Sequence, residues 1–474
     1  MKAGKILIII PYEDVDRKLN VLRKVIYPLE PAIVVSILRE HGFLVEGVDL
    51  NLNFQNEDQI LTLLQKTILR SNSDIVLIMS QHLTFLIKDQ YEILTKIIAS
   101  IRRISAALPI ILAGTTPSLY PEKFFKQRFQ PDILFRGEIE NRIIPIINSL
   151  EDTNMLKTIK GVCIRDKGRI HISGESNFVE DINSLPIADR QIFPLDQYFK
   201  HPETGNLRYP EKSRKFTQIA ATRGCNTGCS FCKVKYLRAR YRRRELNHII
   251  EEIKFLINKK GIEEIHFLDE NLLLNKPKAV KLFQRIIDEP IKFHWFCGGG
   301  MAVYMLDRDI LKLMKLSGCY RLHLAIESGS QRILDKIMKK PIKLTEVLQL
   351  LNYAKELDFE IIGYFMIGLP TETRAEVLKT VALAKNKAFD YVVFSIYTPE
   401  KNTELYNYCI NNNLLDNDKP LYRLSKRAAS NLRFKDYDEK FLISIRNDVW
   451  KQINFAEPKR KEKIKRMFGG IADG

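Results

Sequence analysis

Cysteine is scarce in this chain, with seven in 474 residues. Four of them, Cys163, Cys297, Cys319 and Cys409, stand alone in the sequence, which argues against the disulfide framework of a small secreted protein. Long apolar runs are also missing: the run from Ile6 to Ile10 ends at Pro11, too short for a transmembrane helix, and no small-residue cleavage site follows it. We therefore expect a cytoplasmic protein in a reducing compartment.

A dinucleotide-binding signature is absent as well. No GxGxxG follows the first apolar run, which argues against a bound nicotinamide or flavin dinucleotide. What the chain has in excess is positive charge, with a formal net charge of +18 and a pI near 9.4. This charge is compatible with an anionic partner such as nucleic acid, an acidic membrane or a phosphorylated substrate, and equally with a basic surface that has no partner.

Length and composition indicate a soluble globular protein of two or three domains, because 474 residues exceed one ordinary core and 45% of them are hydrophobic.

The remaining cysteines, Cys225, Cys229 and Cys232, form a CxxxCxxC motif within RGCNTGCSFCK. A structural zinc site needs four ligands, usually two separated pairs, and no fourth Cys or His lies beside this triplet. Three thiolates on one loop suit a four-iron four-sulfur cluster that leaves one iron open. Structural zinc and three unconnected core cysteines are the alternatives.

This motif resembles that of the radical S-adenosylmethionine (SAM) enzymes, in which CxxxCxφC holds a [4Fe-4S] cluster and φ is aromatic. Phe231 occupies the φ position. The resemblance implies that the open iron binds SAM, whose reductive cleavage gives a 5'-deoxyadenosyl radical that abstracts hydrogen from the substrate. It also implies an electron donor such as flavodoxin or ferredoxin.

The first 150 residues alternate apolar strands with amphipathic helices, which is typical of a doubly wound parallel sheet covered on both faces. Ligands of such sheets bind at the carboxyl ends of the strands. The stretches SDIVLIMSQ, LPIILAGTTPSLYPE and PDILFRGEIE resemble a cobalamin-binding domain of the Rossmann-like type. The resemblance implies cobalamin contacts at the predicted strand ends, namely Pro11, Ser80, Gln81, Gly114, Thr115, Gly137 and Glu138.

The DxHxxG signature of other cobalamin proteins, whose His ligates cobalt, is absent. His82 lies at a strand end and is either a neighbour of the corrin or an ordinary packed or solvated histidine. Whether cobalt has a lower axial ligand stays open.

Four segments are predicted. Residues 1–150 form the cobalamin-binding domain, and residues 151–210 form a proline-containing linker with a small hairpin at Gly161 to Ser173. Residues 211–408 repeat a strand–helix unit six times, which resembles the partial (β/α)6 barrel of radical SAM enzymes. Residues 409–474 form a basic, mainly helical C-terminal segment.

Polar or glycine-containing motifs end several predicted barrel strands, and the resemblance implies that they bind SAM. Asp269, Glu270 and Asn271 either accept hydrogen bonds from the SAM ammonium group or cap a helix. The other implied SAM contacts are Glu327, Ser328, Met366, Ile367, Gly368 and Ser395.

One motif departs from the family pattern: after Trp295 the chain reads FCGGG, where an Arg or similar polar residue is usual. The glycines either open space for a bulky ligand or form a flexible turn.

Two basic stretches suggest other partners. The run KVKYLRARYRRR follows Cys232, but it overlaps an arginine-rich family segment, so we expect no nucleic acid. The tRNA methylthiolating enzymes carry three more cluster cysteines in the preceding domain, and this chain has none before Cys163. Residues 451–466 either form a solvated helix or contact an anionic membrane at its surface.

These observations predict a cobalamin-dependent radical SAM enzyme that methylates an unactivated carbon. Oxidative cyclisation or rearrangement with the same cofactors is the first alternative. A non-catalytic metal-binding protein that binds nucleic acid is the second. A small molecule, a lipid or a peptide is compatible with the sequence as substrate, and the oligomeric state stays open.

Overall fold

The computed structural model describes residues 4–12, 25–53, 56–80, 87–174, 176–201, 204, 211–234, 240–416 and 430–454. It divides into two compact units, which are described separately. Unit 1 comprises residues 1–204 and 236–239, and unit 2 comprises residues 205–235 and 240–474. No helix in the described ranges combines the length and apolar character needed to cross a membrane.

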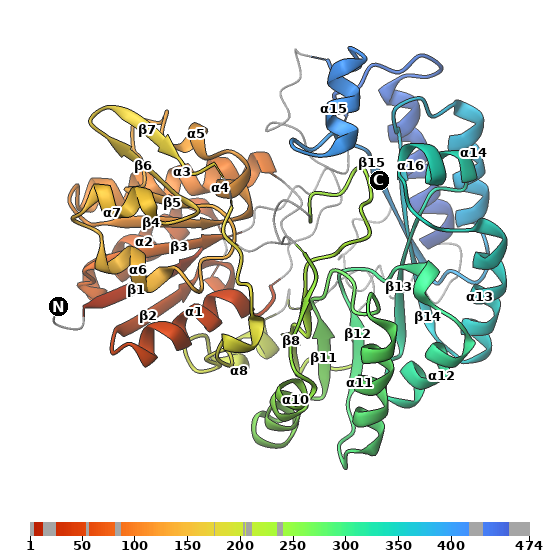
Figure 1. Cartoon of the computed structure of the whole chain (residues 1–474), viewed down its shortest axis with the longest axis horizontal. Coiled ribbons are helices and arrows are strands. Elements are labelled where there is room, and N and C mark those ends of the chain that lie inside the picture. Colours follow the sequence, from red (N-terminus) through yellow and green to blue (C-terminus); the bar gives the residue numbers. More distant parts are fainter. Residues whose placement is uncertain are drawn as a thin grey trace. The chain divides into compact units, whose positions relative to one another are not determined.

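Unit 1 contains a seven-stranded sheet with strand order β2-β1-β3-β4-β5-β6-β7 (Figure 1). Its strands are β1 (Lys5–Ile10), β2 (Leu44–Asp49), β3 (Ile75–Ser80), β4 (Ile110–Gly114), β5 (Ile133–Phe135), β6 (Val162–Asp166) and β7 (Arg169–Ile172). Its helices are α1 (Leu29–Glu40), α2 (Glu57–Ser71), α3 (Ile87–Ile104), α4 (Thr115–Leu119), α5 (Pro121–Phe124), α6 (Ile143–Asn148), α7 (Thr153–Thr158) and α8 (Leu195–Lys200). The first five strands are parallel. The chain order therefore reverses between β1 and β3, the topological switch point at which such sheets bind ligands.

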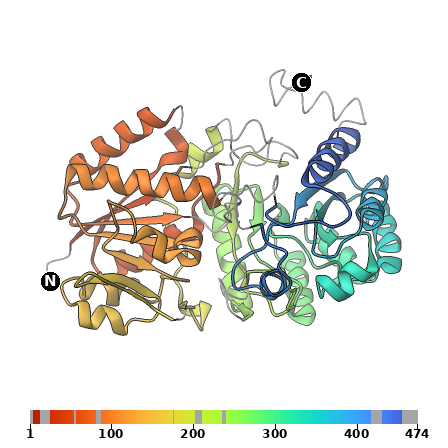
Figure 2. The ribbon, with the colours of Figure 1, turned by 90° about the horizontal axis from the view of Figure 1, so that it is seen from above.

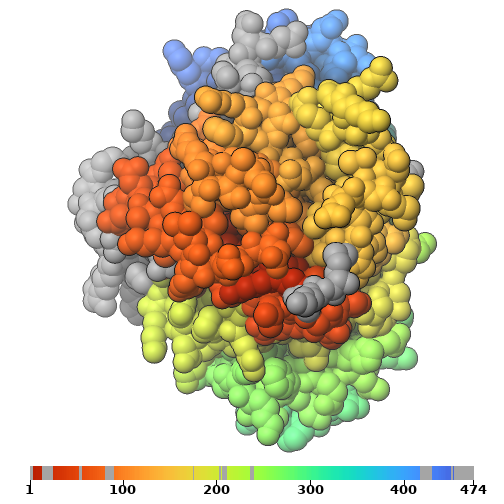
Figure 3. All heavy atoms as spheres, turned by 90° about the vertical axis from the view of Figure 1, so that its left-hand side faces the viewer, coloured from red at the N-terminus to blue at the C-terminus, as the bar shows by residue number. Residues whose placement is uncertain are grey.

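The hairpin expected at Gly161 to Ser173 is present as β6 and β7, but it does not stand apart as a connector. β6 pairs antiparallel with β5 and extends the sheet of unit 1. β6 belongs to the core of this unit because its residues Val162, Cys163 and Ile164 are at most 2% exposed. Figure 3 shows the yellow hairpin region beside the orange helical region on the surface of this unit.

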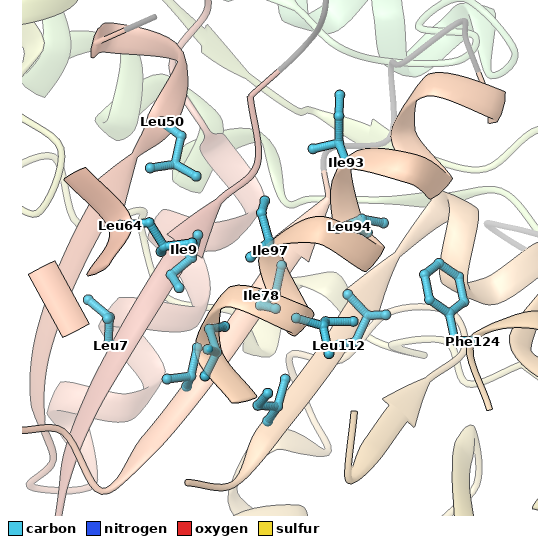
Figure 4. Packing of buried hydrophobic residues seen from close by; sticks show 14 of the residues in the cluster. Leu7, Ile9, Leu50, Leu64, Ile78, Ile93, Leu94, Ile97, Leu112 and Phe124 are labelled. Carbon is cyan, nitrogen blue, oxygen red and sulfur yellow. The ribbon is translucent and has the colours of Figure 1, made fainter. Parts of the chain in front are cut away.

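The core of unit 1 is formed by aliphatic side chains between the sheet and helices α2 and α3 (Figure 4). Ile9, Ile78 and Leu112 are register neighbours on three adjacent parallel strands and point to the same side. Leu64 of α2 and Leu94 of α3 pack against them, and all five side chains are fully buried.

Unit 2 is built from six parallel strands in chain order. Three of them form the sheet β12-β11-β8 and three form the sheet β13-β14-β15. Isolated parallel bridges, Trp295 with Cys319 and Met301 with Leu324, connect β12 to β13, so the two sheets form one partial barrel. The six barrel strands are β8 (Phe216–Ile219), β11 (Glu264–Phe267), β12 (His294–Cys297), β13 (Arg321–Glu327), β14 (Glu360–Ile367) and β15 (Tyr391–Ile396), and the short strands β9 (Thr222–Arg223) and β10 (Arg242–Arg243) form a separate antiparallel pair.

Helices follow the barrel strands, and Figure 2 shows them from above in chain order from green to blue. They are α10 (Leu246–Lys260), α11 (Lys276–Asp288), α12 (Arg308–Leu316), α13 (Leu344–Glu356), α14 (Arg374–Ala384), α15 (Glu404–Asn411) and α16 (Glu439–Asn454). Local signals define several starts: Asn275 and Asp307 accept hydrogen bonds as N-caps, and Thr373 forms a capping box with Glu376.

The C-terminal segment belongs to the packing of unit 2. Helix α16 contacts β15, and Leu442, which is fully buried, lies against the turn at Gly368. Arg374 stacks on Phe441, and its backbone N–H donates to Asp436. Residues 439–442 of α16 therefore pack on the barrel, whereas most of residues 451–466, for which a solvated helix or a membrane contact was predicted, lie outside the described residues.

The packing of α3 gives a stability prediction. Leu94→Ala removes a fully buried side chain from the core of unit 1 and should cost about 2–5 kcal/mol of unfolding free energy. The matched control is Leu69→Ala, because Leu69 on α2 is 68% exposed and its loss should change the free energy by no more than about 0.5 kcal/mol. Urea unfolding followed by circular dichroism measures both. Equal effects would contradict this description of the core.

Candidate active site

The three cysteines of the motif lie on one loop of unit 2, whose base is closed by a short strand pair. Strand β9 pairs antiparallel with β10, and residues 224–241 connect the two strands. Gly224 and Gly228 have φ of 81° and 78°, a region that glycine adopts at little cost. All three cysteines are free and half-buried, and the thiols lie close enough to influence each other's pKa.

Burial raises the pKa of Cys229 above its ordinary value and that of Cys232 to about 12. A cation bound between the thiols would oppose this effect, because metal binding requires thiolates. Among the described residues no group of three His, Cys, Asp or Glu side chains is arranged to hold a single metal ion. The loop and its thiols fit the donor set of a cluster, and their assignment as cluster ligands remains a prediction.

Asp269 and Glu270, which follow β11, fix the start of the cysteine loop. Asp269 is fully buried and accepts hydrogen bonds from the backbone N–H of Ala221 (3.1 Å) and from Thr222 Oγ1 (2.5 Å). Glu270 Oε2 accepts from the backbone N–H of Gly224 at 2.9 Å. Burial raises the pKa of Asp269 to about 6. The two carboxylates therefore make structural contacts that the sequence does not reveal.

Asn271 differs from its two neighbours. It is only 2% exposed, and its Oδ1 atom has no hydrogen-bond partner among the described residues. A buried amide oxygen without a partner is costly. Asn271 is thus the residue of this motif whose side chain is best placed to receive a donor from a ligand.

Glu327 ends β13 in an unusual conformation. Its φ of 73° is rare for a residue with a side chain, and the register with β14 shifts between Ala325 and Glu327. Its carboxylate accepts a hydrogen bond from Lys340 Nζ at 2.9 Å, and both residues are less than 10% exposed. Backbone strain of this kind is concentrated at functional sites.

Lys340 is a site residue that sequence reasoning missed. Its ammonium group lies 6.0 Å from the ring centroid of Phe231, within the cysteine loop. Burial acts to lower the pKa of Lys340, but the charges of Glu327 and Cys229 outweigh it, so the pKa is raised. Ser230 of the cysteine loop donates hydrogen bonds to the carbonyls of Ile337 and Met338, which lie just before Lys340 in the chain.

Tyr304 and Thr227 were missed as well. The Tyr304 hydroxyl lies 2.6 Å from Thr227 Oγ1, which lies 3.2 Å from Cys225 Sγ. Tyr304 comes from the 3-10 turn Val303–Met305 that follows β12, 77 residues away from Thr227. Sequence spacing gives no sign of this contact.

The other predicted SAM contacts fall into two groups. Met366 and Ser395 are register partners on β14 and β15, and both are partly exposed. Ile367 and Ser328 are fully buried, and Ser328 Oγ lies 3.3 Å from Thr380 Oγ1 of α14. Gly368, with φ of 79°, donates its N–H to the buried Glu372. The side chains of Ile367 and Ser328 are therefore engaged in packing.

The residues predicted to contact cobalamin lie in unit 1, at the carboxyl ends of its parallel strands, and the structure brings only some of them together. Ser80, Gly114 and Thr115 lie together at the ends of β3 and β4, and a Cβ atom on Gly114 would lie 2.1 Å from Ser80 Oγ. The carbonyl of Pro11, at the end of β1, accepts a hydrogen bond from Asn51. Gln81 and His82 lie outside the described residues.

Gly137 and Glu138 have packing roles in this unit. A Cβ atom on Gly137 would lie 2.1 Å from the carbonyl oxygen of Asn177, and Glu138 Oε2 accepts from the backbone N–H of Val179. Both residues hold the segment that follows the β6–β7 hairpin. Their assignment to cobalamin remains a prediction.

Comparisons with known proteins agree with this geometry. Residues 219–384 match the radical SAM superfamily model. The matched segment contains the three motif cysteines and strands β11 to β14, so residues 219–384 carry a radical SAM domain. The chain is 29% identical to the uncharacterized methyltransferase PH0819 of Pyrococcus horikoshii over 418 residues, covering 88% of this chain and 85% of the relative. It is 24% identical to cytidylyl-2-hydroxyethylphosphonate methyltransferase of Streptomyces wedmorensis, covering 90% of this chain and 85% of that relative.

Two solved structures share the fold of this chain over most of its length. The cobalamin-dependent enzyme OxsB matches with a TM-score of 0.71 at 16% identity, covering 98% of this chain and 70% of its own. The methyltransferase TsrM from Kitasatospora setae was solved with cobalamin and a [4Fe-4S] cluster. It matches with a TM-score of 0.69 at 18% identity, covering 86% of this chain and 78% of its own. The predicted fold class, a Rossmann-like sheet followed by a partial barrel, is confirmed.

The glycine triplet gives a second prediction. A Cβ atom on Gly299 would lie 2.4 Å from the carbonyl oxygen of Asp269, whereas one on Gly298 would meet nothing closer than 3.7 Å. Gly299→Ala should displace the end of β11 and cost about 1–3 kcal/mol of unfolding free energy, while Gly298→Ala should be tolerated. Thermal unfolding of the two variants measures the difference. Equal tolerance would favour a flexible turn over a close backbone approach.

Glu372 gives a pH prediction. Its burial raises the pKa to about 8, above the ordinary value of 4.5. The folded state therefore holds this proton more tightly than the unfolded state does, and stability is lost as the pH rises from about 4.5 through 8. Glu372→Gln, which cannot ionise, should lose less thermal stability than the unmodified protein between pH 6 and pH 9. The exposed Glu356→Gln is the control, and an identical pH dependence in all three proteins would contradict the assignment.

Proposed function

We propose that this chain is a cobalamin-dependent radical SAM methyltransferase acting on an unactivated carbon of a small-molecule substrate. The observation that carries the proposal is the combination, in one chain, of the fastened cysteine loop and a Rossmann-like sheet of the same fold as in TsrM and OxsB. The methyltransferase names of the two relatives matched over nearly their whole length support the reaction type.

In this proposal Cys225, Cys229 and Cys232 hold the [4Fe-4S] cluster, and unit 1 holds cobalamin at the carboxyl ends of β1, β3 and β4. When bound, the cluster supplies the electron for SAM cleavage and cobalamin supplies the methyl group.

The chain's own residues provide binding and charge. The Lys340 ammonium group lies beside the cysteine loop, where it offsets the negative charge of thiolates. Asn271 and the Glu327 carboxylate offer hydrogen-bond acceptors to a ligand ammonium group, and the partly exposed Met366 offers an apolar contact. The Tyr304 and Thr227 hydroxyls orient the Cys225 end of the loop.

Two further partners belong to this proposal. A flavodoxin or ferredoxin would supply the electron. The basic stretch 451–466 would contact an anionic membrane surface, although most of it lies outside the described residues. Nucleic acid is not part of this proposal; in the described part of the basic run after Cys232, Arg244 pairs with Glu252 at 2.5 Å and Arg243 donates to the Lys278 carbonyl.

The products of SAM test this function without knowledge of the substrate. The anaerobically purified protein is incubated with SAM and dithionite, with and without added cobalamin, and 5'-deoxyadenosine and S-adenosylhomocysteine are quantified by mass spectrometry. We expect 5'-deoxyadenosine in the reduced protein and S-adenosylhomocysteine only when cobalamin is present.

Changing all three motif cysteines to Ala should abolish 5'-deoxyadenosine formation, whereas changing the isolated Cys409 to Ala should not. Formation of 5'-deoxyadenosine with no cobalamin-dependent S-adenosylhomocysteine would refute methyl transfer. It would favour cyclisation, the reaction named for a relative 25% identical over 58% of this chain, the anaerobic magnesium-protoporphyrin IX monomethyl ester cyclase of Cereibacter sphaeroides.

A further inference from the structure

The inner face of the barrel sheet is defined here as the face that carries Ala325, Tyr364, Met366 and Ser395. Ala325 is the register partner of Tyr364, and Met366 is the register partner of Ser395. Register partners in a parallel sheet share a face, as do residues two apart along one strand. These four side chains therefore belong to one surface that crosses β13, β14 and β15.

The opposite face is packed and closed. Trp295 stacks on Phe283 of α11 with ring centroids 5.2 Å apart, and Phe365 stacks on Phe394 of the neighbouring strand at 5.3 Å. Trp295 and Phe365 are at most 1% exposed. By contrast, Ala325, Tyr364, Met366 and Ser395 are all partly exposed, so solvent reaches the inner face.

A row of rings lies across the inner face. Phe216 of β8 stacks on His266 of β11 at 4.4 Å, and His266 lies 4.1 Å from Phe296 of β12. Phe296 stacks on His323 of β13 at 4.9 Å with nearly parallel planes. These four rings are at most 6% exposed, so they form a rigid, buried layer.

The row ends at Tyr364. The phenolic hydroxyl lies 2.8 Å from Nδ1 of His323, whose ring is fixed by its stacking on Phe296. Tyr364 is thus the ring of this row that combines partial exposure with a hydroxyl held in place by a buried partner. A phenolic oxygen both donates and accepts, so it can serve His323 and a ligand at the same time.

On the described strands β13, β14 and β15, the inner-face residues adjacent to Tyr364 in the register or along the strand are uncharged. Ala325 and Met366 are apolar, and Ser395 adds a second hydroxyl. The charged side chains of β13 and β14 are paired, Glu327 with Lys340 and Arg321 with Glu360 at 2.6 Å. A charged ligand group placed here would lose hydration without gaining an unpaired counter-ion.

We propose that the Tyr364 hydroxyl, held by His323, positions the substrate, and that the substrate presents to it an uncharged, largely apolar part with one hydrogen-bonding group. The proposal deepens the function proposed above and rests on it, since it places the substrate on the inner face beside Met366, a residue proposed to contact SAM. Tyr364 acts as a binding and specificity residue for the part of the substrate that enters the barrel.

Three small aromatic probes test the proposed chemistry directly on the anaerobically purified full chain. p-Cresol is apolar with one hydroxyl, toluene lacks the hydroxyl, and 4-methylbenzoate carries a charge. Binding is measured by saturation-transfer NMR titration. We expect p-cresol to bind more tightly than toluene, and 4-methylbenzoate to bind most weakly.

Variants locate the binding. Tyr364→Phe should weaken p-cresol binding about two- to tenfold, the loss of one hydrogen bond, and leave toluene binding unchanged, which also shows that the variant is folded. Ala325→Leu should weaken both by filling the inner face. The control Tyr353→Phe makes the same chemical change on helix α13 and should alter neither.

Equal p-cresol binding by Tyr364→Phe, or no effect of Ala325→Leu, would overturn the proposal, as would tighter binding of 4-methylbenzoate. The probe experiment needs no SAM turnover. If methyl transfer fails but the probes bind in the expected order, the proposed reaction is wrong and the proposed site stands. If methyl transfer is found but the probes do not bind in this order, only the role of Tyr364 is wrong.

Discussion

The hydrogen bonds made by the carboxylates of Asp269 and Glu270 tie the cysteine loop to the barrel, and the candidate site depends on them. Asp269 binds the backbone N–H of Ala221 and the side chain of Thr222, where β9 begins, and Glu270 binds Gly224, the residue just before Cys225. Because Asp269 is fully buried, its loss would leave both donors without a partner in a dry environment, at a cost of about 1–3 kcal/mol each. These hydrogen bonds hold the start of the cysteine loop against the barrel.

Gly299 also packs closely against Asp269, the residue that holds the start of the cysteine loop. The segment that follows β12 passes so near the Asp269 carbonyl that a side chain at position 299 has no room. On the other side of the loop, Ser230 binds the carbonyls that precede Lys340, which places a buried ammonium group beside the thiols. The loop is therefore fixed by contacts from the end of β11 and from the segment that precedes Lys340, and the ammonium group of Lys340 lies next to it.

Local patterns predicted much of this structure. The runs from Lys5 to Pro11 and from Asp74 to Met79 became β1 and β3 within about one residue, because buried parallel strands are continuous apolar stretches. The cysteine motif could also be found in the sequence, because its three cysteines lie within eight residues.

The missed residues share a different property, because each acts across a long sequence separation. Tyr304 is 77 residues from Thr227, and Lys340 is 13 residues from Glu327 and further still from Phe231. Asp269 was predicted to bind SAM or to cap a helix, and its contacts with the neighbouring strand end depend on how β8 and β11 pair. The packing of α16 against the turn at Gly368 also depends on tertiary contacts, which the sparse apolar residues of the C-terminal segment did not reveal.

The central claim is that Cys225, Cys229 and Cys232 hold an iron–sulfur cluster in a chain that also binds a corrin. Iron and acid-labile sulfide analysis of anaerobically purified protein, combined with its absorption spectrum after cobalamin loading, tests this claim most directly. The account predicts about four irons and four sulfides per chain, their loss in the triple Cys→Ala variant, and a corrin spectrum that stays with the protein through gel filtration. Zinc in place of iron, or iron retained without the three cysteines, would contradict it.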